Sequence, residues 1–369
     1  DSGGIGLAIC RTVIISIAVA AVLLISGVLL LVNWPKDEAG GVIVGELEVI
    51  GDDYLSTCEY LSGGVGTETS PYLLEGLTIL VSEQGTLDPR GISLMSIQAH
   101  LIIRNSTFDV NPALAQLSST LSQPCGLFIH HSRNITIESC TFGNLTHGVI
   151  VESGSSVNIK NCSVRNCDIG IKFDETFPPV LRCALTDNDI SLCECGIYVN
   201  GDMFTWNIDI VNNSITSCDT GISGYEADLL LIKRNRIGWC EDAAICLRSS
   251  SQVTIEENHL FNCERDGIVI NDGRYIDIMS NYITVAGVGV LVSQSQIIEI
   301  EANEIWRSYG WIVSIGIFVD SCIFTNVTEN SLMSASVGIL ICLAQDQDDT
   351  VVLLDNYFGD TVEIEVGRV

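Results

Sequence analysis

A glycine followed by alternating apolar residues recurs along the chain at nearly constant spacing. The copies begin at Gly91, Gly126, Gly148, Gly170, Gly196, Gly221, Ala244, Gly267, Gly289, Gly316 and Gly338. From Gly126 to Gly338 the motif advances by 212 residues in nine steps, or about 23.6 residues per step. A repeat of this length that contains strand-like segments is typical of a solenoid, in which each unit packs on its neighbours.

A second strand-like segment precedes each glycine, and its residues align in two columns. The polar column reads Ser106, Cys140, Cys162, Asn188, Asn213, Asn235, Asn258, Asn281, Asn303, Asn330 and Asn356. Two residues later, an apolar column reads Phe108, Phe142, Val164, Ile190, Ile215, Ile237, Leu260, Ile283, Ile305, Leu332 and Phe358. We expect the asparagines to lie at turns, because Asn tolerates left-handed backbone and its amide can bond the next Asn in a stack.

These patterns predict an all-β fold, a parallel β-helix of about eleven coils over residues 70–369. Alternation places every second side chain inside, and stacking at about 4.8 Å per coil gives a rod of roughly 50 Å. Residues 36–69 are interpreted as a linker and a cap on the first coil, and residues 1–35 as a separate hydrophobic helix.

The repeat region resembles the parallel β-helix repeat families, which include NosD-like proteins and carbohydrate-binding and sugar-hydrolase domains. The segment SPYLLEGLTI, Ser70 to Ile79, is similar to their entry into the first coil. The resemblance implies a right-handed helix, which the repeat itself does not show. It implies little about function, because this fold hosts lyases, hydrolases, adhesins and scaffolds.

Residues Thr12 to Trp34 form an uncharged apolar stretch that is long enough to cross a bilayer as a helix. Arg11 precedes it, which favours an N-terminus inside and a body outside the membrane. A buried core helix is the alternative. The chain starts at Asp1 and keeps this segment, a pattern that resembles type IV pilins, although Ile5 stands where many pilins have an acidic residue.

Charge and composition exclude several classes of function. The formal net charge is -29, so nucleic acid is not expected as a partner. The hydrophobic fraction of 47% excludes a disordered chain. No Ser/His/Asp order, HExxH motif or phosphate-binding glycine loop is present, and no cofactor is expected.

Cysteines form a column of their own five residues after the asparagines, at Cys167, Cys193, Cys218, Cys240 and Cys263. A stack of small buried hydrophobic residues is the favoured interpretation, with some disulfides as the alternative. Six Asn-x-Ser/Thr sequons predict glycosylation of an extracellular body, at Asn105, Asn134, Asn144, Asn161, Asn212 and Asn326.

Candidate catalytic residues are few. Glu152 and Asp174 are predicted neighbours one coil apart, with Lys172 beside them, and a solvated acidic face is the alternative. His130 and His131 are adjacent in a strand, so we expect them on opposite faces. Three carboxylates in one loop are weak candidates for a metal site, at Asp346, Asp348 and Asp349.

The outward column two residues after each glycine is mostly apolar and is a candidate interface. Its apolar members are Phe128, Ile150, Tyr198, Val269, Leu291, Phe318 and Leu340. A soluble monomer should not expose such a stripe, so self-association through it and through the N-terminal helix is expected. Two functions remain open. One is a cell-surface structural protein, either a pilin-like filament subunit or a membrane-anchored scaffold or adhesin. The other is a membrane-tethered carbohydrate-active enzyme or glycan-binding module.

The first prediction concerns the segment Thr12–Trp34. Its apolar side chains would each cost roughly 1.5–3 kcal/mol if left in water, so we expect it to be buried in a membrane or a filament core. Fractionation of the full chain with and without detergent measures this. A protein that stays monomeric and soluble without detergent, with the segment intact, would contradict the prediction.

Overall fold

The computed structural model describes residues 42–44, 46–81, 89–110, 123–174, 182–201, 207–307, 314–343, 350–359 and 362–368. Residues 44–369 form one compact unit. The described strands form three sheets of 13 strands each, which we name sheets A, B and C. From β4 onward, every coil contributes one strand to sheet C, then one to sheet A, then one to sheet B.

The strand bounds are as follows. Sheet C contains β3 (Leu61–Gly63), β4 (Tyr72–Glu75), β7 (Leu101–Arg104), β10 (Arg133–Glu138), β13 (Ser155–Lys160), β16 (Cys183–Thr186), β19 (Ile208–Val211), β22 (Leu230–Lys233), β25 (Ser251–Glu256), β28 (Arg274–Met279), β31 (Gln296–Glu301), β34 (Ile323–Thr328) and β37 (Val351–Leu354). Sheet A contains β1 (Val42–Val44), β5 (Leu77–Val81), β8 (Thr107–Val110), β11 (Thr141–Gly143), β14 (Ser163–Arg165), β17 (Asp189–Ser191), β20 (Ser214–Thr216), β23 (Arg236–Gly238), β26 (His259–Cys263), β29 (Tyr282–Val285), β32 (Glu304–Arg307), β35 (Ser331–Met333) and β38 (Tyr357–Phe358). Sheet B contains β2 (Leu47–Ile50), β6 (Arg90–Met95), β9 (Cys125–His130), β12 (His147–Glu152), β15 (Ile169–Asp174), β18 (Cys195–Asn200), β21 (Thr220–Tyr225), β24 (Ala243–Arg248), β27 (Asp266–Asn271), β30 (Val288–Ser293), β33 (Ile315–Asp320), β36 (Val337–Leu343) and β39 (Val362–Arg368).

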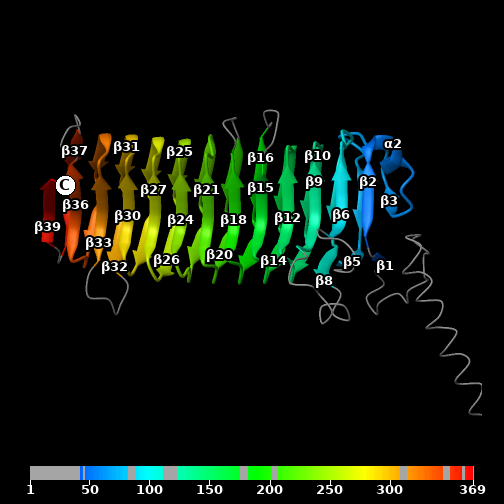
Figure 1. Ribbon diagram of the computed structural model, residues 1–369, viewed down its shortest axis with the longest axis horizontal. Coiled ribbons are helices and arrows are strands. Elements are labelled where there is room, and N and C mark those ends of the chain that lie inside the picture. Colours follow the sequence, from blue (N-terminus) through cyan, green and yellow to red (C-terminus); the bar gives the residue numbers. More distant parts are fainter. Residues whose placement is uncertain are drawn as a thin grey trace, which may run out of the picture. The chain divides into compact units, whose positions relative to one another are not determined.

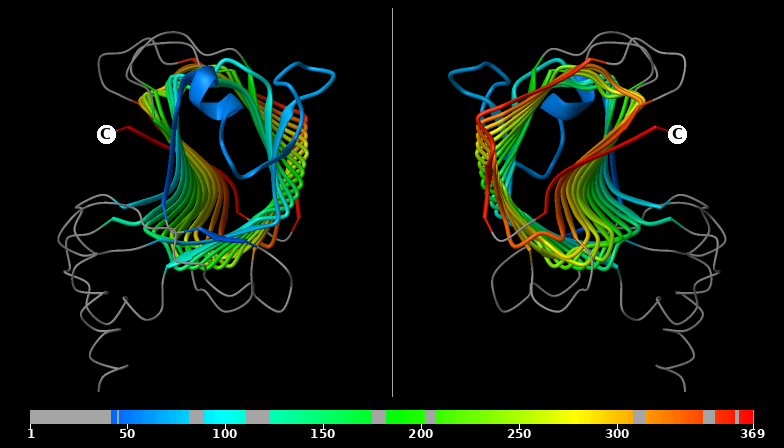
Figure 2. Two further views of the ribbon diagram at one scale, coloured as in Figure 1. Left: turned by 90° about the vertical axis from the view of Figure 1, so that its right-hand side faces the viewer. Right: turned by 90° about the vertical axis from the view of Figure 1, so that its left-hand side faces the viewer.

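The predicted parallel β-solenoid is confirmed. Successive coils lie side by side along the unit formed by residues 44–369 (Figure 1), and their strands pair in parallel from β4 onward. Viewed along the axis, the coils overlay as a closed outline (Figure 2). The sheets have more strands than the eleven coils expected, because pairing extends to β2 at one end and to β39 at the other.

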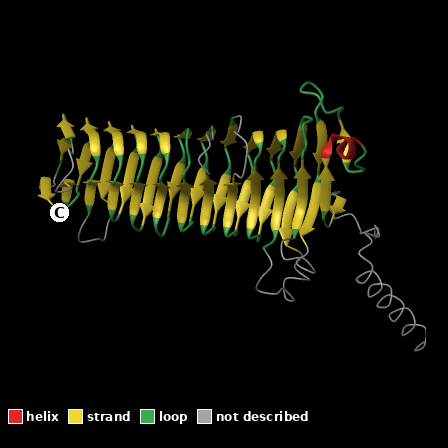
Figure 3. Cartoon of the chain, turned by 45° about the horizontal axis from the view of Figure 1, so that its top comes forward, coloured by secondary structure: helices red, strands yellow, loops and turns green. Residues whose placement is uncertain are grey.

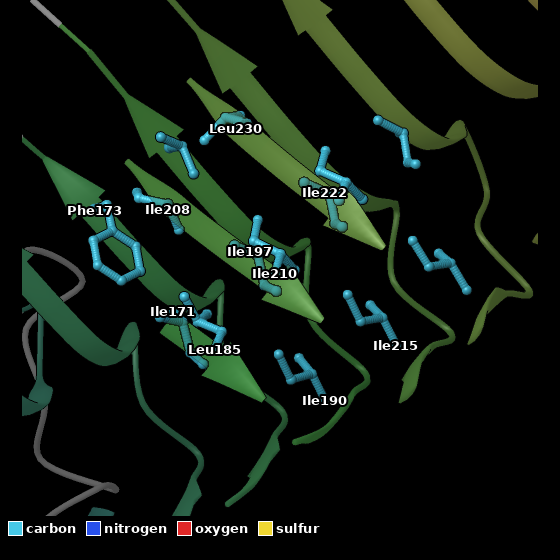
Figure 4. Close-up of a cluster of buried hydrophobic side chains, with 14 of the residues drawn as sticks. Ile171, Phe173, Leu185, Ile190, Ile197, Ile208, Ile210, Ile215, Ile222 and Leu230 are labelled. Carbon is cyan, nitrogen blue, oxygen red and sulfur yellow. The ribbon is translucent and has the colours of Figure 1, made fainter. Parts of the chain in front are cut away.

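The core lies between the three sheets and runs through every coil (Figure 4). One coil supplies Ile171 and Phe173 from sheet B, and the next supplies Leu185 from sheet C and Ile190 from sheet A, all with no exposed surface. The predicted apolar column is buried as expected, except Phe358, which is half-buried in the last coil. Each such side chain contributes roughly 1.5–3 kcal/mol of burial free energy, so the core stabilises the stack along its whole length.

The asparagine column forms a buried ladder at the turn between sheets C and A. Asn235 is typical: its backbone N–H and its Nδ2 donate to Asn258 Oδ1 at 2.9 and 3.0 Å, and Nδ2 also donates to the Ile210 carbonyl of the preceding coil at 2.8 Å. The same bonds continue from Asn258 to Asn281 and from Asn281 to Asn303. Each rung therefore ties three successive coils together.

The backbone geometry at this turn differs from the expectation. The left-handed residue is the one before each ladder asparagine, such as Asp187 (φ 58°), Arg234 (φ 55°) and Ala302 (φ 54°). The asparagine itself is selected for its buried amide, because its side chain satisfies backbone groups that the turn would leave without partners. The position with positive φ, before each ladder asparagine, is occupied by many residue types, among them Asp, Arg and Ala.

The glycine that opens each motif is required by the close approach of coils. A Cβ on Gly170 would lie 2.5 Å from the Gly196 carbonyl oxygen and 3.0 Å from the Ile190 side chain. The repeat tolerates one departure, Ala244, which is fully buried. The glycine therefore lies where the chain enters sheet B and where the neighbouring coil leaves little room for a side chain.

The first coil is preceded by an added helix, α2, and by the strands β2 and β3. β2 pairs in parallel with β6, β3 pairs in antiparallel with β4, and α2 (Gly51–Ser56) buries Leu55 in the core. Asp52 fixes α2 by accepting hydrogen bonds from the backbone N–H groups of Gln98 and Ala99 at 2.8 and 3.0 Å. The repeat pattern does not predict α2. The hydrophobic segment 12–34 lies outside the described residues, and among the helices that are described none has the length and hydrophobicity to span a bilayer.

The ladder yields the second prediction. Asn258→Leu removes the acceptor of Asn235 and the donor to the Ile232 carbonyl, so we expect a loss of unfolding free energy of about 1–3 kcal/mol for each buried group left without a partner. Denaturant unfolding measures it. Asn158→Leu, on the exposed side of β13, is the matched control, and equal midpoints for the two variants would contradict the role of the ladder.

Candidate functional site

The outer face of sheet B presents two columns of side chains in strict register. The first reads Ser93, Phe128, Ile150, Lys172, Tyr198, Ser223, Cys246, Val269, Leu291, Phe318 and Leu340. The second reads Met95, His130, Glu152, Asp174, Asn200, Tyr225, Arg248, Asn271, Ser293, Asp320 and Cys342. The structure thus places the predicted residues of both columns on the outer face of one sheet. Figure 3 shows the stacked strands along the unit.

Glu152 and Asp174 are directly opposite one another on β12 and β15. Their backbones are therefore about 4.8 Å apart, a spacing at which two carboxylates repel. Each has a nitrogen-bearing partner: His130 Nδ1 on the neighbouring strand β9 lies 2.7 Å from Glu152 Oε2, and Lys172 Nζ on the same strand, β15, lies 2.5 Å from Asp174 Oδ2. Asn200 Nδ2 also donates to Asp174 Oδ1 at 2.8 Å. These partners stabilise a carboxylate pair that would otherwise oppose the stacking of the coils.

The expectation that His130 and His131 face opposite ways is wrong. His131 Nδ1 lies 2.5 Å from His130 Nε2, and the rings meet edge to face at 4.0 Å. The reason is local backbone geometry, because His131 has a φ of 46° and follows the end of β9. Alternation of side chains ends with the strand, so both rings belong to the Glu152 cluster. The position recurs along the repeat, because positive φ is also found directly after other sheet B strands, at Ser96, Ser153, Glu226, Ser249, Asp272, Gln294 and Ser321.

Aromatic rings border the polar cluster. Phe128 stacks parallel to His130 with centroids 5.9 Å apart, and the Arg90 guanidinium lies 3.5 Å from the Phe128 centroid. Tyr198 is next to Lys172 in the register, and burial raises the pKa of its phenol. Ser93 lies beside Phe128, and its buried Oγ has no hydrogen-bond partner in the part of the chain that the structure describes.

We name this group the sheet B cluster: His130, His131, Glu152, Lys172, Asp174, Tyr198 and Asn200. It offers carboxylates and imidazoles that can accept hydrogen bonds, an ammonium and an amide that donate them, and the phenol ring of Tyr198. This mixture suits a ligand with many hydroxyl groups. The His130–Glu152 contact also joins two groups of the kinds that transfer protons in general acid–base catalysis.

Two further groups of predicted site residues are the three loop carboxylates and the six sequons. Asp346, Asp348 and Asp349 lie outside the described residues, and no group of three or more potential metal ligands occurs within the described part of the chain. Asn105, Asn144, Asn161, Asn212 and Asn326 are exposed and Asn134 is half-buried, so glycosylation stays a prediction.

The cysteine column is buried along the turn between sheets A and B. Cys167, Cys193, Cys218, Cys240 and Cys263 are at most 4% exposed and occur as free thiols. Contact with Cys193 and burial both raise the pKa of the Cys167 thiol. The column therefore serves as packing within the core.

Most of the apolar stripe on sheet B is only half-buried. Phe128 is 6% exposed, whereas Ile150, Val269, Leu291, Phe318 and Leu340 are of intermediate exposure. The C-terminal members Val269, Leu291, Phe318 and Leu340 occupy four consecutive coils without interruption.

The chain is similar in fold to several known proteins. The sequence profile of the right-handed β-helix region matches residues 90–182 and 180–332. No curated protein sequence matches the chain. Among solved structures it is similar to the surface adhesin PfbA of Streptococcus pneumoniae, with a TM-score of 0.58 and 14% identity over 90% of this chain and 85% of that one.

Two epimerases have similar folds as well. The A-module of the mannuronan C-5 epimerase AlgE6 of Azotobacter vinelandii aligns with a TM-score of 0.54 and 14% identity, over 90% of this chain and 92% of that one. The periplasmic alginate epimerase AlgG aligns with a TM-score of 0.55 and 12% identity, over 81% of this chain and 85% of that one. At these identities the structural similarity establishes the fold alone, and its right-handedness rests on the family profile. The site must be argued from its own residues.

Proposed function

The chain belongs to the right-handed β-helix family, and from this premise we propose that it is a surface-displayed protein that binds glycan along the outer face of sheet B, between β9 and β21. The NosD-like resemblance and an extracellular location form part of the same proposal. The similar folds of a surface adhesin and two alginate epimerases support it, because all three are known from surface, periplasmic or polysaccharide contexts.

The observation that supports glycan binding best is the sheet B cluster. Its hydrogen-bonding side chains occupy four consecutive strands, β9, β12, β15 and β18, one coil above another. A ligand that follows the axis of the rod would meet one polar group of the cluster about every 4.8 Å. This repeat suits an extended polymer, and the half-buried Tyr198 supplies a flat face beside it.

The two carboxylates of the cluster already have partners. Asp174 pairs with the Lys172 ammonium, and Glu152 Oε2 lies 2.7 Å from His130 Nδ1, on a chain of net charge -29. Neutral and uronate-containing polysaccharides are both compatible with this arrangement. The carbohydrate-active alternative rests on the same residues, with His130 and Glu152 as the proton-transferring pair.

The third prediction tests the cluster. Affinity electrophoresis of the full chain through gels containing alginate, polygalacturonate or laminarin should show retardation by at least one of them. Glu152→Gln and Asp174→Asn should each weaken that binding about tenfold, or about 1.4 kcal/mol, because a charged hydrogen-bond acceptor is lost.

The matched control is Asp320→Asn, because Asp320 is in the same column on β33, far from the cluster. Its binding should equal that of the unaltered chain. Mobility unaffected by all three polysaccharides, or equal losses in Asp320→Asn and Asp174→Asn, would contradict the proposal.

A second role, self-association, is favoured by the unbroken apolar run Val269, Leu291, Phe318 and Leu340. Half-exposed apolar side chains in register offer another subunit a flat strip to cover. Filament assembly or membrane anchoring through residues 12–34 would bring such strips together at the cell surface.

The fourth prediction follows from this strip. Leu291→Asp or Phe318→Asp should weaken assembly of the full chain while the coils still fold, because both side chains lie on the outer face. Analytical ultracentrifugation and circular dichroism measure the two properties. Ser293→Asp, on the same strand in the polar column, is the control, and normal assembly of both apolar variants would refute the role.

A further inference from the structure

A groove lies on the outer face of sheet C, a different sheet from the one that bears the sheet B cluster. It has a volume of about 360 Å³ and spans three coils. Its lining residues are Gln252, Val253, Thr254, Tyr275, Asp277, Ile297 and Glu299. We name it the sheet C groove.

Two of the residues that line the groove, Tyr275 and Ile297, bulge out of their strands, and so does Phe324 on the next strand, β34, beside the groove. Tyr275, Ile297 and Phe324 stand at equivalent positions of β28, β31 and β34, and their φ values are 56°, 57° and 54°. The pairing of the strands skips them, since it runs from Arg274 to Gln296 and resumes at Ile276 and Ile298. Their side chains are 43%, 37% and 60% exposed.

β34, the strand next to the groove, has an unusual inversion of polarity. Phe324 is exposed, whereas the next residue, Thr325, is completely buried and its Oγ1 has no hydrogen-bond partner among the described residues. The buried hydroxyl without a partner costs stability, and the exposed Phe gains none from burial. Departures of this kind are expected where a surface serves a function.

The floor of the groove is acidic. Asp277 and Glu299 are directly opposite one another on β28 and β31, at a spacing of about 4.8 Å. Burial raises the pKa of the Asp277 carboxyl. Neither side chain forms an ion pair with any residue that the structure describes. Elsewhere on this sheet, Asp209 in the same column pairs with Arg182 through a 2.8 Å hydrogen bond.

These features select a ligand by shape and by charge. Flat ring faces stack against the faces of sugar rings, and Arg274, which donates to the Tyr275 hydroxyl at 3.2 Å, holds one of these rings in place. Tyr275 and Phe324 are two coils apart, or about 9.6 Å, a length comparable to a disaccharide. Two adjacent carboxylates without cationic partners repel an anionic glycan and attract a positive charge.

We infer that the sheet C groove binds a cationic glycan, a chain of unacetylated amino sugars whose rings stack on Tyr275 and Phe324 and whose ammonium groups bond Asp277 and Glu299. This goes beyond the glycan binding proposed for sheet B, because it involves another face, other residues and a ligand of defined charge. Either site can fail without the other.

The fifth prediction is a calorimetric titration of the full chain with a glucosamine hexamer. The hexamer should bind at least tenfold more tightly than the N-acetylglucosamine hexamer, which has the same rings without the charge. Asp277→Asn and Phe324→Ala should each weaken binding about tenfold, or about 1.4 kcal/mol. Phe324 is exposed, so its truncation leaves folding intact, as a melting curve would verify.

Matched controls separate this site from general charge attraction. Asp209→Asn removes a carboxylate of the same column outside the groove, and Trp239→Ala removes a ring that is equally exposed, at 58%. Both should bind like the unaltered chain, as should the sheet B variant Glu152→Gln. Equal binding of spermine and the glucosamine hexamer, or unchanged binding by Phe324→Ala, would overturn the inference.

Discussion

Every feature of this protein depends on the register between coils, which the buried asparagine ladder fixes. Each rung accepts two hydrogen bonds from one neighbouring coil and donates to carbonyl groups on either side. A slip of one residue would leave these buried groups without partners and would turn the apolar face of each strand outward. The ladder therefore determines which side chains form the core and, equally, which ones face solvent.

Because the coils stack in register, side chains at equivalent positions of the repeat form columns. These columns make up the outer faces of the sheets. Glu152 and Asp174 are 22 residues apart in sequence but directly opposite in the sheet, and the same holds for Asp277 and Glu299. Like charges opposite one another oppose stacking. His130 and Lys172 offset this repulsion at Glu152 and Asp174, whereas the structure describes no such partner for Asp277 and Glu299.

The buried columns were predictable from the sequence, and the left-handed positions were not. The asparagine, apolar and cysteine columns follow a fixed period, so their burial follows from alternation. His131 and Tyr275 lie at positions whose left-handed backbone recurs in several coils, but these positions hold many residue types, so no residue preference marks them. Ile297 and Ile298 are identical neighbours, yet one is 37% exposed and the other is fully buried, because side chains alternate along the strand.

A core supplied by all three sheets leaves the outer faces free to differ in chemistry. Changing an outward residue alters neither the ladder nor the buried columns, so each face can acquire its own ligand at little cost in stability. On sheet B the carboxylates of the cluster contact His130 and Lys172. On sheet C, Asp277 and Glu299 have no ion-pair partner among the described residues, and the ring of Tyr275 lines the same groove. The same stacking can therefore present two surfaces of different chemistry on one solenoid.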